Sequence, residues 1–225
     1  YIADLVLALR EMFRLDFISS SASIIVYGLP ESVYCAIVML VLKQKNVPYQ
    51  LHPVDVFNKN GVPANHLARH PFGKIPVLQL GDFLLYETRP IIRYIDDRWP
   101  EPPLLPASAL DRARVEQIMS VLDSYAYQTM VWDVYVQGSK EEGVDEKRIA
   151  NGLAQSEKCL QAIGRYQCSD SHLVGRSLSL ADFYAYPMLK YFSQSEQGAD
   201  LLTKFPRMNL WLDSMSARFN FPPST

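Results

Sequence analysis

Apolar residues between positions 23 and 100 follow two kinds of spacing, which indicates short strands mixed with helices. Four short apolar runs are predicted to be strands: 23–27, 47–54, 75–80 and 83–86. Three stretches with helical spacing lie among them: 32–46, 66–70 and 88–98. Gly81 and Asp82, between the last two runs, are typical of a hairpin turn. The predicted order is therefore β-α-β-α-β-β-α.

The pattern changes after four prolines at positions 100–106, which predict a stiff linker and a domain boundary. Strand signals then disappear, and four helices are expected: 110–137, 144–167, 179–192 and 208–219. The sequence predicts an α/β domain at 23–100, an all-α domain at 107–225, and an N-terminal extension at 1–22.

The composition of the chain argues against several classes of function. The 225 residues are 48% hydrophobic and 20% charged, as in a globular protein with a full core. A net charge of −2 gives no electrostatic footprint for nucleic acid. The richest apolar stretch, 24–42, is interrupted by Gly28 and Pro30, so no membrane span is expected. Segment 1–22 carries acidic residues and makes a poor signal peptide.

Only three cysteines are present: Cys35, Cys159 and Cys168. This odd, sparse set is no disulfide framework, which favours a reducing compartment and a cytoplasmic location. The four histidines lack metal-ligand spacing with each other or with cysteine, so no metal site is expected.

Three short motifs carry candidate chemistry, and each also has a purely structural interpretation. Pro76 is either a strand-entry proline or part of a cis bond that leaves the Ile75 main chain free for a ligand. Glu87 and Thr88 precede a helix, where they either cap it or clamp an amino and a carboxylate group. Ser32 starts the first helix, most often a capping position.

Taken in order, these motifs resemble the cytosolic glutathione transferase family, over about residues 23–220. Phi enzymes have a stretch like Asn-Pro-Phe-Gly-Lys-Val-Pro, and this chain has it at 70–76 as His-Pro-Phe-Gly-Lys-Ile-Pro. Theta enzymes have Ser-Gln-Pro-Cys, and 32–35 keeps both ends. The family's Glu-Ser pair corresponds to Glu87-Thr88, and its capping box to Ser179 and Asp182. The closest patterns are therefore the serine-type classes.

The resemblance implies a thioredoxin-like first domain, a helical second domain, a homodimer and bound glutathione. It implies that Ile75, beside Pro76, pairs its main chain with the cysteinyl part of glutathione. Glu87 and Thr88 would hold the γ-glutamyl end, while Lys74 and the loop residue Lys59 would lie near the glycyl carboxylate.

The resemblance implies that Ser32 donates to the glutathione sulfur and stabilises its thiolate. Two alternatives stay open. Tyr27 lies near the place where tyrosine-type classes carry their activating hydroxyl, and Cys35 could act as a thiol. The chain departs from the family at Ala36, where many serine-type members carry arginine, and Glu31 adds a negative charge beside Ser32.

The expected activity is conjugation of glutathione to a small apolar electrophile, without a metal. Leu29 and Tyr34 are candidates for one wall of the electrophile pocket, and Met130 and Trp132 for the other, although aromatic residues on a long helix usually belong to a core. Two alternatives remain: another glutathione-dependent reaction (peroxide reduction, isomerisation or dehalogenation), and a non-catalytic binding protein that keeps the fold.

Overall fold

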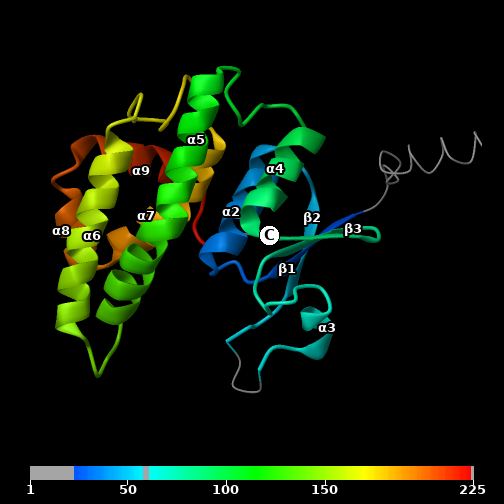
Figure 1. Ribbon diagram of the computed structural model, residues 1–225, viewed down its shortest axis with the longest axis horizontal. Helices are drawn as coiled ribbons and strands as arrows, with labels where there is room; N and C mark the ends of the chain where they lie inside the picture. The colour runs from blue at the N-terminus through cyan, green and yellow to red at the C-terminus, as the bar shows by residue number, and fades with distance from the viewer. Residues whose placement is uncertain (1–22, 58–60, 224–225) are drawn as a thin grey trace, which may run out of the picture.

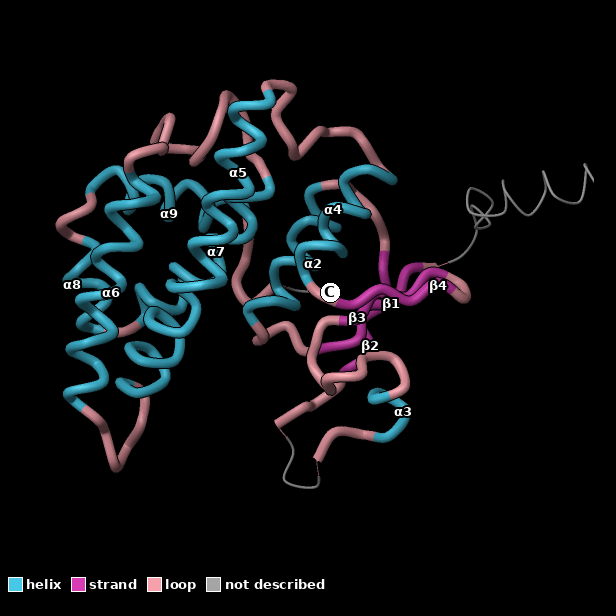
Figure 2. Tube along the Cα trace, viewed as in Figure 1, coloured by secondary structure: helices cyan, strands magenta, loops and turns pink. Residues whose placement is uncertain are grey.

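A four-stranded sheet forms the first part of the computed structural model, which describes residues 23–57 and 61–223 (Figures 1 and 2). The strand order is β2-β1-β3-β4. β1 (Ile24–Gly28) runs parallel to β2 (Tyr49–Pro53) and antiparallel to β3 (Val77–Leu80), and β3 pairs antiparallel with β4 (Phe83–Tyr86). With helices α2 (Val33–Gln44), α3 (Ala64–Leu67) and α4 (Thr88–Arg98), this gives the predicted β-α-β-α-β-β-α order of a thioredoxin-like domain.

Helix α2 lies between the sheet and the rest of the molecule, beside α4 (Figure 1). Its sequence VYCAIVMLVLKQ is apolar on nearly every side, and nine of its residues are buried. A helix that is apolar all round has to be covered on all sides. The sheet and α4 cover part of it, and the second domain covers the rest.

The second domain contains helices only, within the described residues. They are α5 (Ala109–Val121), the π-helix η1 (Leu122–Val136), α6 (Glu146–Gly164), α7 (Leu180–Gln194), α8 (Glu196–Leu202) and α9 (Pro206–Arg218). No described helix is both long enough and apolar enough to cross a membrane. The predicted 1–22 extension lies outside the described residues.

Several predicted boundaries differ from the structure. The second and third strands are shorter than predicted, since their ends lie outside the ladders, and the turn predicted at 66–70 forms earlier, as α3. The helix predicted at 110–137 is α5 continued by the wider turns of η1. Helix α8 was not predicted, because it is only seven residues long and contains a glycine. Gly198 is required there, because a Cβ would come within 2.1 Å of the Phe192 carbonyl oxygen.

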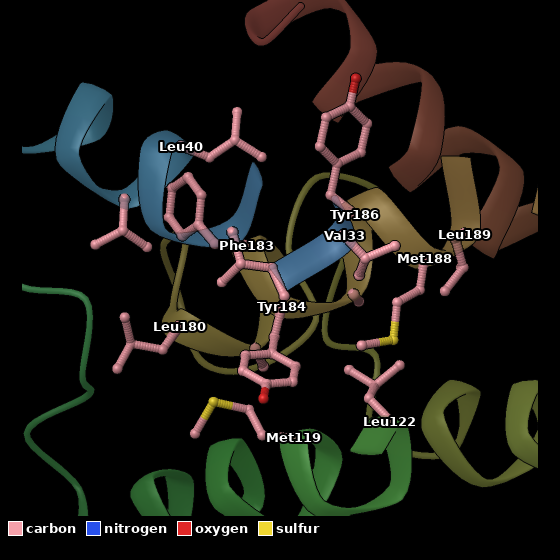
Figure 3. Close-up of a cluster of buried hydrophobic side chains, with 14 of the residues drawn as sticks. Val33, Leu40, Met119, Leu122, Leu180, Phe183, Tyr184, Tyr186, Met188 and Leu189 are labelled. Atoms are coloured by element: carbon pink, nitrogen blue, oxygen red, sulfur yellow. The ribbon is translucent and has the colours of Figure 1, made fainter. Parts of the chain in front are cut away.

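The core of the second domain is arranged around α7 (Figure 3). Phe183, Tyr184 and Tyr186 on this helix are at most 1% exposed. Figure 3 shows Phe183 beside Leu40 of α2 and Tyr184 directed toward Met119. Tyr186 points toward the C-terminal helix, where its hydroxyl donates to the Phe219 carbonyl oxygen at 2.8 Å. One continuous apolar cluster therefore joins the two domains.

Asp182, in the first turn of α7, is fully buried and organises this end of the helix. Its carboxylate accepts hydrogen bonds from Ser179 N (2.8 Å) and Oγ (2.9 Å), Leu173 N (2.8 Å) and Trp211 Nε1 (2.8 Å). Burial raises the pKa of Asp182, and the hydrogen bonds oppose that rise. The predicted capping box is present and also ties α7 to α9 and to the preceding loop.

We predict that Asp182→Ala lowers the free energy of unfolding by about 3 kcal/mol or more, because it leaves several buried donors without a partner. Asp145→Ala is the matched control, since this exposed N-cap of α6 accepts a bond from one residue, Arg148. This control substitution should lower the free energy of unfolding by about 1 kcal/mol. Urea titration measures both, and equal losses would contradict the role given to Asp182.

Candidate functional site

A cavity of about 390 Å³ lies where the two domains meet, and we call it the interdomain cavity. First-domain residues make most of its wall, and two residues come from η1 and α7. The lining residues are Tyr34, His70, Lys74, Ile75, Pro76, Glu87, Thr88, Arg89, Pro90, Asp123 and Tyr184. All five described residues predicted to bind glutathione are therefore brought together, whereas Lys59 lies outside the described residues.

The loop before β3 contributes Lys74, Ile75 and Pro76 to the wall of this cavity. The ladder of β3 with β1 begins at Val77, so Ile75 lies outside it, and the Ile75–Pro76 bond is cis. The buried His66 donates from Nε2 to the Lys74 carbonyl oxygen at 2.8 Å. This hydrogen bond fixes the main chain next to Ile75, while the Lys74 residue itself is exposed.

The start of α4 forms another part of the cavity wall. Glu87 has φ of +70°, a conformation that non-glycine residues rarely adopt and that often marks a functional site. It occupies the N-cap position without using its side chain as a cap, so its exposed carboxylate is available. Thr88 begins the helix, where unpaired amides and the helix dipole favour a negative group.

Ser32 is the N-cap of α2, and its Oγ accepts a 3.5 Å hydrogen bond from Cys35 N. It does not line the interdomain cavity, although Tyr34 on the same helix does. The residue before it is held from the second domain, because the Tyr191 hydroxyl on α7 donates to the Glu31 carbonyl oxygen at 2.6 Å. The start of α2 is therefore fixed by both domains.

Tyr27 and Cys35, the two alternatives to Ser32 as the residue that activates the glutathione thiol, have different surroundings. The Tyr27 hydroxyl donates to Gln79 Oε1 at 2.7 Å, and the guanidinium of Arg69 lies 4.2 Å from the centre of its ring. Tyr27 lines a different cavity, which shares no residue with the interdomain one.

Cys35 is fully buried, and burial raises its pKa to about 11. A Cβ at Gly28 would lie 2.3 Å from its sulfur, so this thiol is tightly enclosed. A buried thiol with a raised pKa is a poor nucleophile at neutral pH.

Of the four residues predicted for the electrophile pocket, only Tyr34 lines the interdomain cavity. Met130 is fully buried in the helical core, and Leu29 packs against a small cluster around Cys35. Trp132 faces the first domain elsewhere, with its ring 6.4 Å from that of Phe57.

Five cavity residues were not singled out from the sequence: His70, Arg89, Pro90, Asp123 and Tyr184. Arg89 directly follows Thr88, so its position next to a predicted binding residue could have identified it as a candidate. Asp123 and Tyr184 come from distant helices, and only the packing of the domains brings them to the cavity. Among the described residues, no group of three or more His, Cys, Asp or Glu side chains could hold a metal ion.

Comparison with known proteins identifies both domains. Residues 26–103 match the sequence profile of the glutathione S-transferase N-terminal domain, and residues 144–214 match that of the C-terminal domain. Glutathione S-transferase hmp2 of Hypomyces subiculosus is 30% identical over 191 residues, which cover 80% of this chain and 88% of that protein. A stringent starvation protein A homolog of Haemophilus ducreyi is 28% identical over 157 residues, 70% of this chain and 69% of that protein.

Solved structures agree with this assignment. The apo form of glutathione S-transferase III superposes with a TM-score of 0.74 and 28% identity, and the match covers 88% of this chain and 93% of that chain. Human glutathione S-transferase T1-1 has the same fold, with a TM-score of 0.75 at 24% identity over 87% of this chain and 83% of that one. On these matches, the chain belongs to the glutathione S-transferase family.

Proposed function

We propose that this protein is a glutathione transferase that uses the interdomain cavity to bind the tripeptide. The observation that carries the proposal is that one cavity is lined by Ile75, by Glu87 and Thr88 at the α4 N-terminus, and by Lys74. A tripeptide with an amino group, two carboxylates and a thiol needs these complementary groups. Membership of the family supports the same conclusion.

The groups of the cavity suggest how glutathione lies in it. The free Ile75 main chain pairs with the cysteinyl unit like an added strand, next to Pro76. The Glu87 carboxylate binds the γ-glutamyl ammonium, and Thr88 with the first amides of α4 binds the neighbouring carboxylate. Lys74 binds the glycyl carboxylate, and Lys59, which lies outside the described residues, is proposed to assist it.

Ser32 is the proposed activator, at the start of α2. Its hydroxyl oxygen accepts from Cys35 N, which leaves its proton free to bond a sulfur anion. Lowering a thiol pKa by about two units from 8.5 requires roughly 2.7 kcal/mol of preference for the thiolate. A hydrogen bond to a charged group contributes about 1.5–3 kcal/mol, and a helix N-terminus about 0.3–1 kcal/mol. Together, the hydrogen bond and the helix N-terminus contribute enough free energy to lower the thiol pKa by about two units.

In the proposed reaction the thiolate attacks an electrophilic carbon of an apolar co-substrate, and the protein supplies orientation and charge stabilisation. The same site would also serve another glutathione-dependent reaction, such as peroxide reduction, isomerisation or dehalogenation. A non-catalytic role remains the second candidate, because stringent starvation protein A homologs are also similar to this chain. Turnover of an electrophile with glutathione separates the two.

We further propose a homodimer formed through the β4 edge of the sheet. Phe72 is 71% exposed, and its ring is 6.1 Å from that of His70, which also contacts the exposed Tyr86. An exposed apolar patch of this kind favours a protein contact.

We place the domain boundary in the 100–106 linker, between domains at 23–100 and 107–225. The free state of all three cysteines supports a cytoplasmic location.

We predict that Ser32→Ala reduces conjugation at neutral pH about tenfold or more and raises the pKa of the bound thiol by one unit or more. The loss of conjugation activity should be smaller at alkaline pH, because the glutathione thiol ionises there without a hydrogen bond from Ser32. The pH profile of kcat/KM measures this. An unchanged profile would return the assignment to Tyr27 or Cys35.

We predict that Glu87→Gln weakens glutathione binding about tenfold, because an ammonium loses its charged partner. Titration calorimetry measures the Kd directly, and kcat at saturating glutathione should change little. Asp97→Asn is the control, since this exposed carboxylate lies on the same helix but away from the cavity. Equal effects of the two substitutions would contradict a specific clamp.

We predict that Phe72→Asp shifts the protein from dimer to monomer, because it places a charge in an apolar contact. Phe57→Asp is a matched control, as Phe57 is 70% exposed and lies elsewhere on the first domain. Sedimentation velocity distinguishes the species. A wild-type protein that sediments as a monomer at micromolar concentration contradicts the proposed dimer.

A further inference from the structure

The peptide unit between Glu31 and Ser32 is held on both of its sides. Its N–H, which belongs to Ser32, donates to the Leu29 carbonyl oxygen at 3.1 Å. Its carbonyl oxygen, which belongs to Glu31, accepts a 2.6 Å hydrogen bond from the Tyr191 hydroxyl on α7. Because a trans peptide unit is planar and its N–H and C=O point in opposite directions, these two bonds fix the plane. The plane in turn sets the position from which the Ser32 side chain starts.

The two hydrogen bonds come from different domains. The bond to Leu29 closes a turn inside the first domain, whereas Tyr191 lies 160 residues after Glu31 in the sequence. Among the residues that the structure describes, the bond from Tyr191 is the only hydrogen bond between this turn and the second domain. The orientation of the turn that precedes α2 therefore depends on one hydroxyl group of α7.

The Tyr191 ring is itself held by two aromatic neighbours. Tyr135 on η1 packs against it with ring centres 4.7 Å apart, and Phe221 packs edge-on at 4.8 Å. Because these contacts already restrict the ring, the hydrogen bond to Glu31 forms at a small cost in side-chain entropy. Burial and the nearby Tyr135, Glu31 and Tyr127 raise the pKa of Tyr191 to about 12. The hydroxyl therefore keeps its proton, and remains a donor, over the range in which a glutathione thiol ionises.

The direction of the Ser32 hydroxyl matters for its proposed task. Its oxygen accepts from Cys35 N at 3.5 Å, which leaves its single proton for the sulfur. A hydrogen bond weakens steeply when it is bent, so a donor that stabilises a thiolate has to be aimed before the charge forms.

We infer that Tyr191 is a positioning residue for thiol activation: it fixes the Glu31–Ser32 peptide unit and thereby aims the Ser32 hydroxyl at the glutathione sulfur. The inference rests on the proposed function and deepens it. Tyr191 does not line the interdomain cavity, so its effect on the thiolate is separate from binding of the tripeptide.

The test measures the pKa of the thiol of bound glutathione from the ultraviolet absorbance of its thiolate, with no electrophile present. Tyr191→Phe removes the hydroxyl and keeps the ring that packs against Tyr135 and Phe221. We expect this substitution to raise the thiol pKa by about half a unit, as the loss of one aligned hydrogen bond allows. With chlorodinitrobenzene, kcat/KM at neutral pH should then fall about threefold, because about a third of the thiolate remains. The Kd for glutathione, from calorimetry, should not change.

Tyr186→Phe is the matched control. Tyr186 lies on the same helix, and its hydroxyl also donates to a main-chain carbonyl oxygen, that of Phe219 at 2.8 Å. Because that hydrogen bond is buried and distant from Ser32 in sequence, the control should lower stability and leave the thiol pKa at the wild-type value. The double variant Ser32→Ala/Tyr191→Phe should have the thiol pKa of Ser32→Ala alone, because Tyr191 acts through Ser32.

A wild-type thiol pKa in Tyr191→Phe overturns the inference, whether or not kcat/KM falls. An equal rise of the thiol pKa in Tyr186→Phe overturns it too, as does a rise that adds to the effect of Ser32→Ala. If Tyr191→Phe fails to fold, Phe221→Leu is the second variant, since it loosens the Tyr191 ring and keeps the hydroxyl. It should raise the thiol pKa in the same direction, and an unchanged value overturns the inference.

The same measurements separate this inference from the proposed function. A wild-type protein that neither binds glutathione nor turns over chlorodinitrobenzene overturns both. A protein that binds glutathione with a lowered thiol pKa, which Ser32→Ala raises and Tyr191→Phe does not, overturns only the inference.

Discussion

The structure depends on the burial of α2 between the sheet and α7. This helix is too apolar to have a solvent face, so the second domain must cover it. That packing brings Tyr34 of α2 and the Ile75 loop together with Asp123 and Tyr184 of the second domain around one cavity. The stability of the core and the geometry of the site are therefore two results of the same contact.

The sequence predicted the first domain well because its signals are local. The hairpin at Gly81, the cap at Ser32 and the motif at 70–76 each require only neighbouring residues. Strand ends were less accurate, because hydrogen-bond register decides them. The capping box at Ser179 and Asp182 was found for the same reason, but the bond from Trp211 was not, since it joins residues far apart in the chain.

Six of the nine first-domain residues that line the interdomain cavity were singled out from the sequence, whereas neither of the two from the second domain was. Met130 and Asp123 lie on the same helix, and helical spacing alone cannot tell which one reaches the cavity. Its place on the long helix suggested Met130 for the pocket, yet the packing of η1 buries Met130 in the core, and Asp123 accepts a hydrogen bond from the Tyr34 hydroxyl. Long-range packing decides this, and a pattern along the chain does not contain it.

The close approach of Gly28 to Cys35 has a consequence for oxidative stress. Cys35 has no exposed surface, and the Gly28 backbone approaches its sulfur so closely that a Cβ there would lie 2.3 Å from it. Oxidised glutathione in the proposed site would therefore meet no exposed Cys35 sulfur with which to form a mixed disulfide. The enclosure of this thiol thus keeps it out of disulfide exchange.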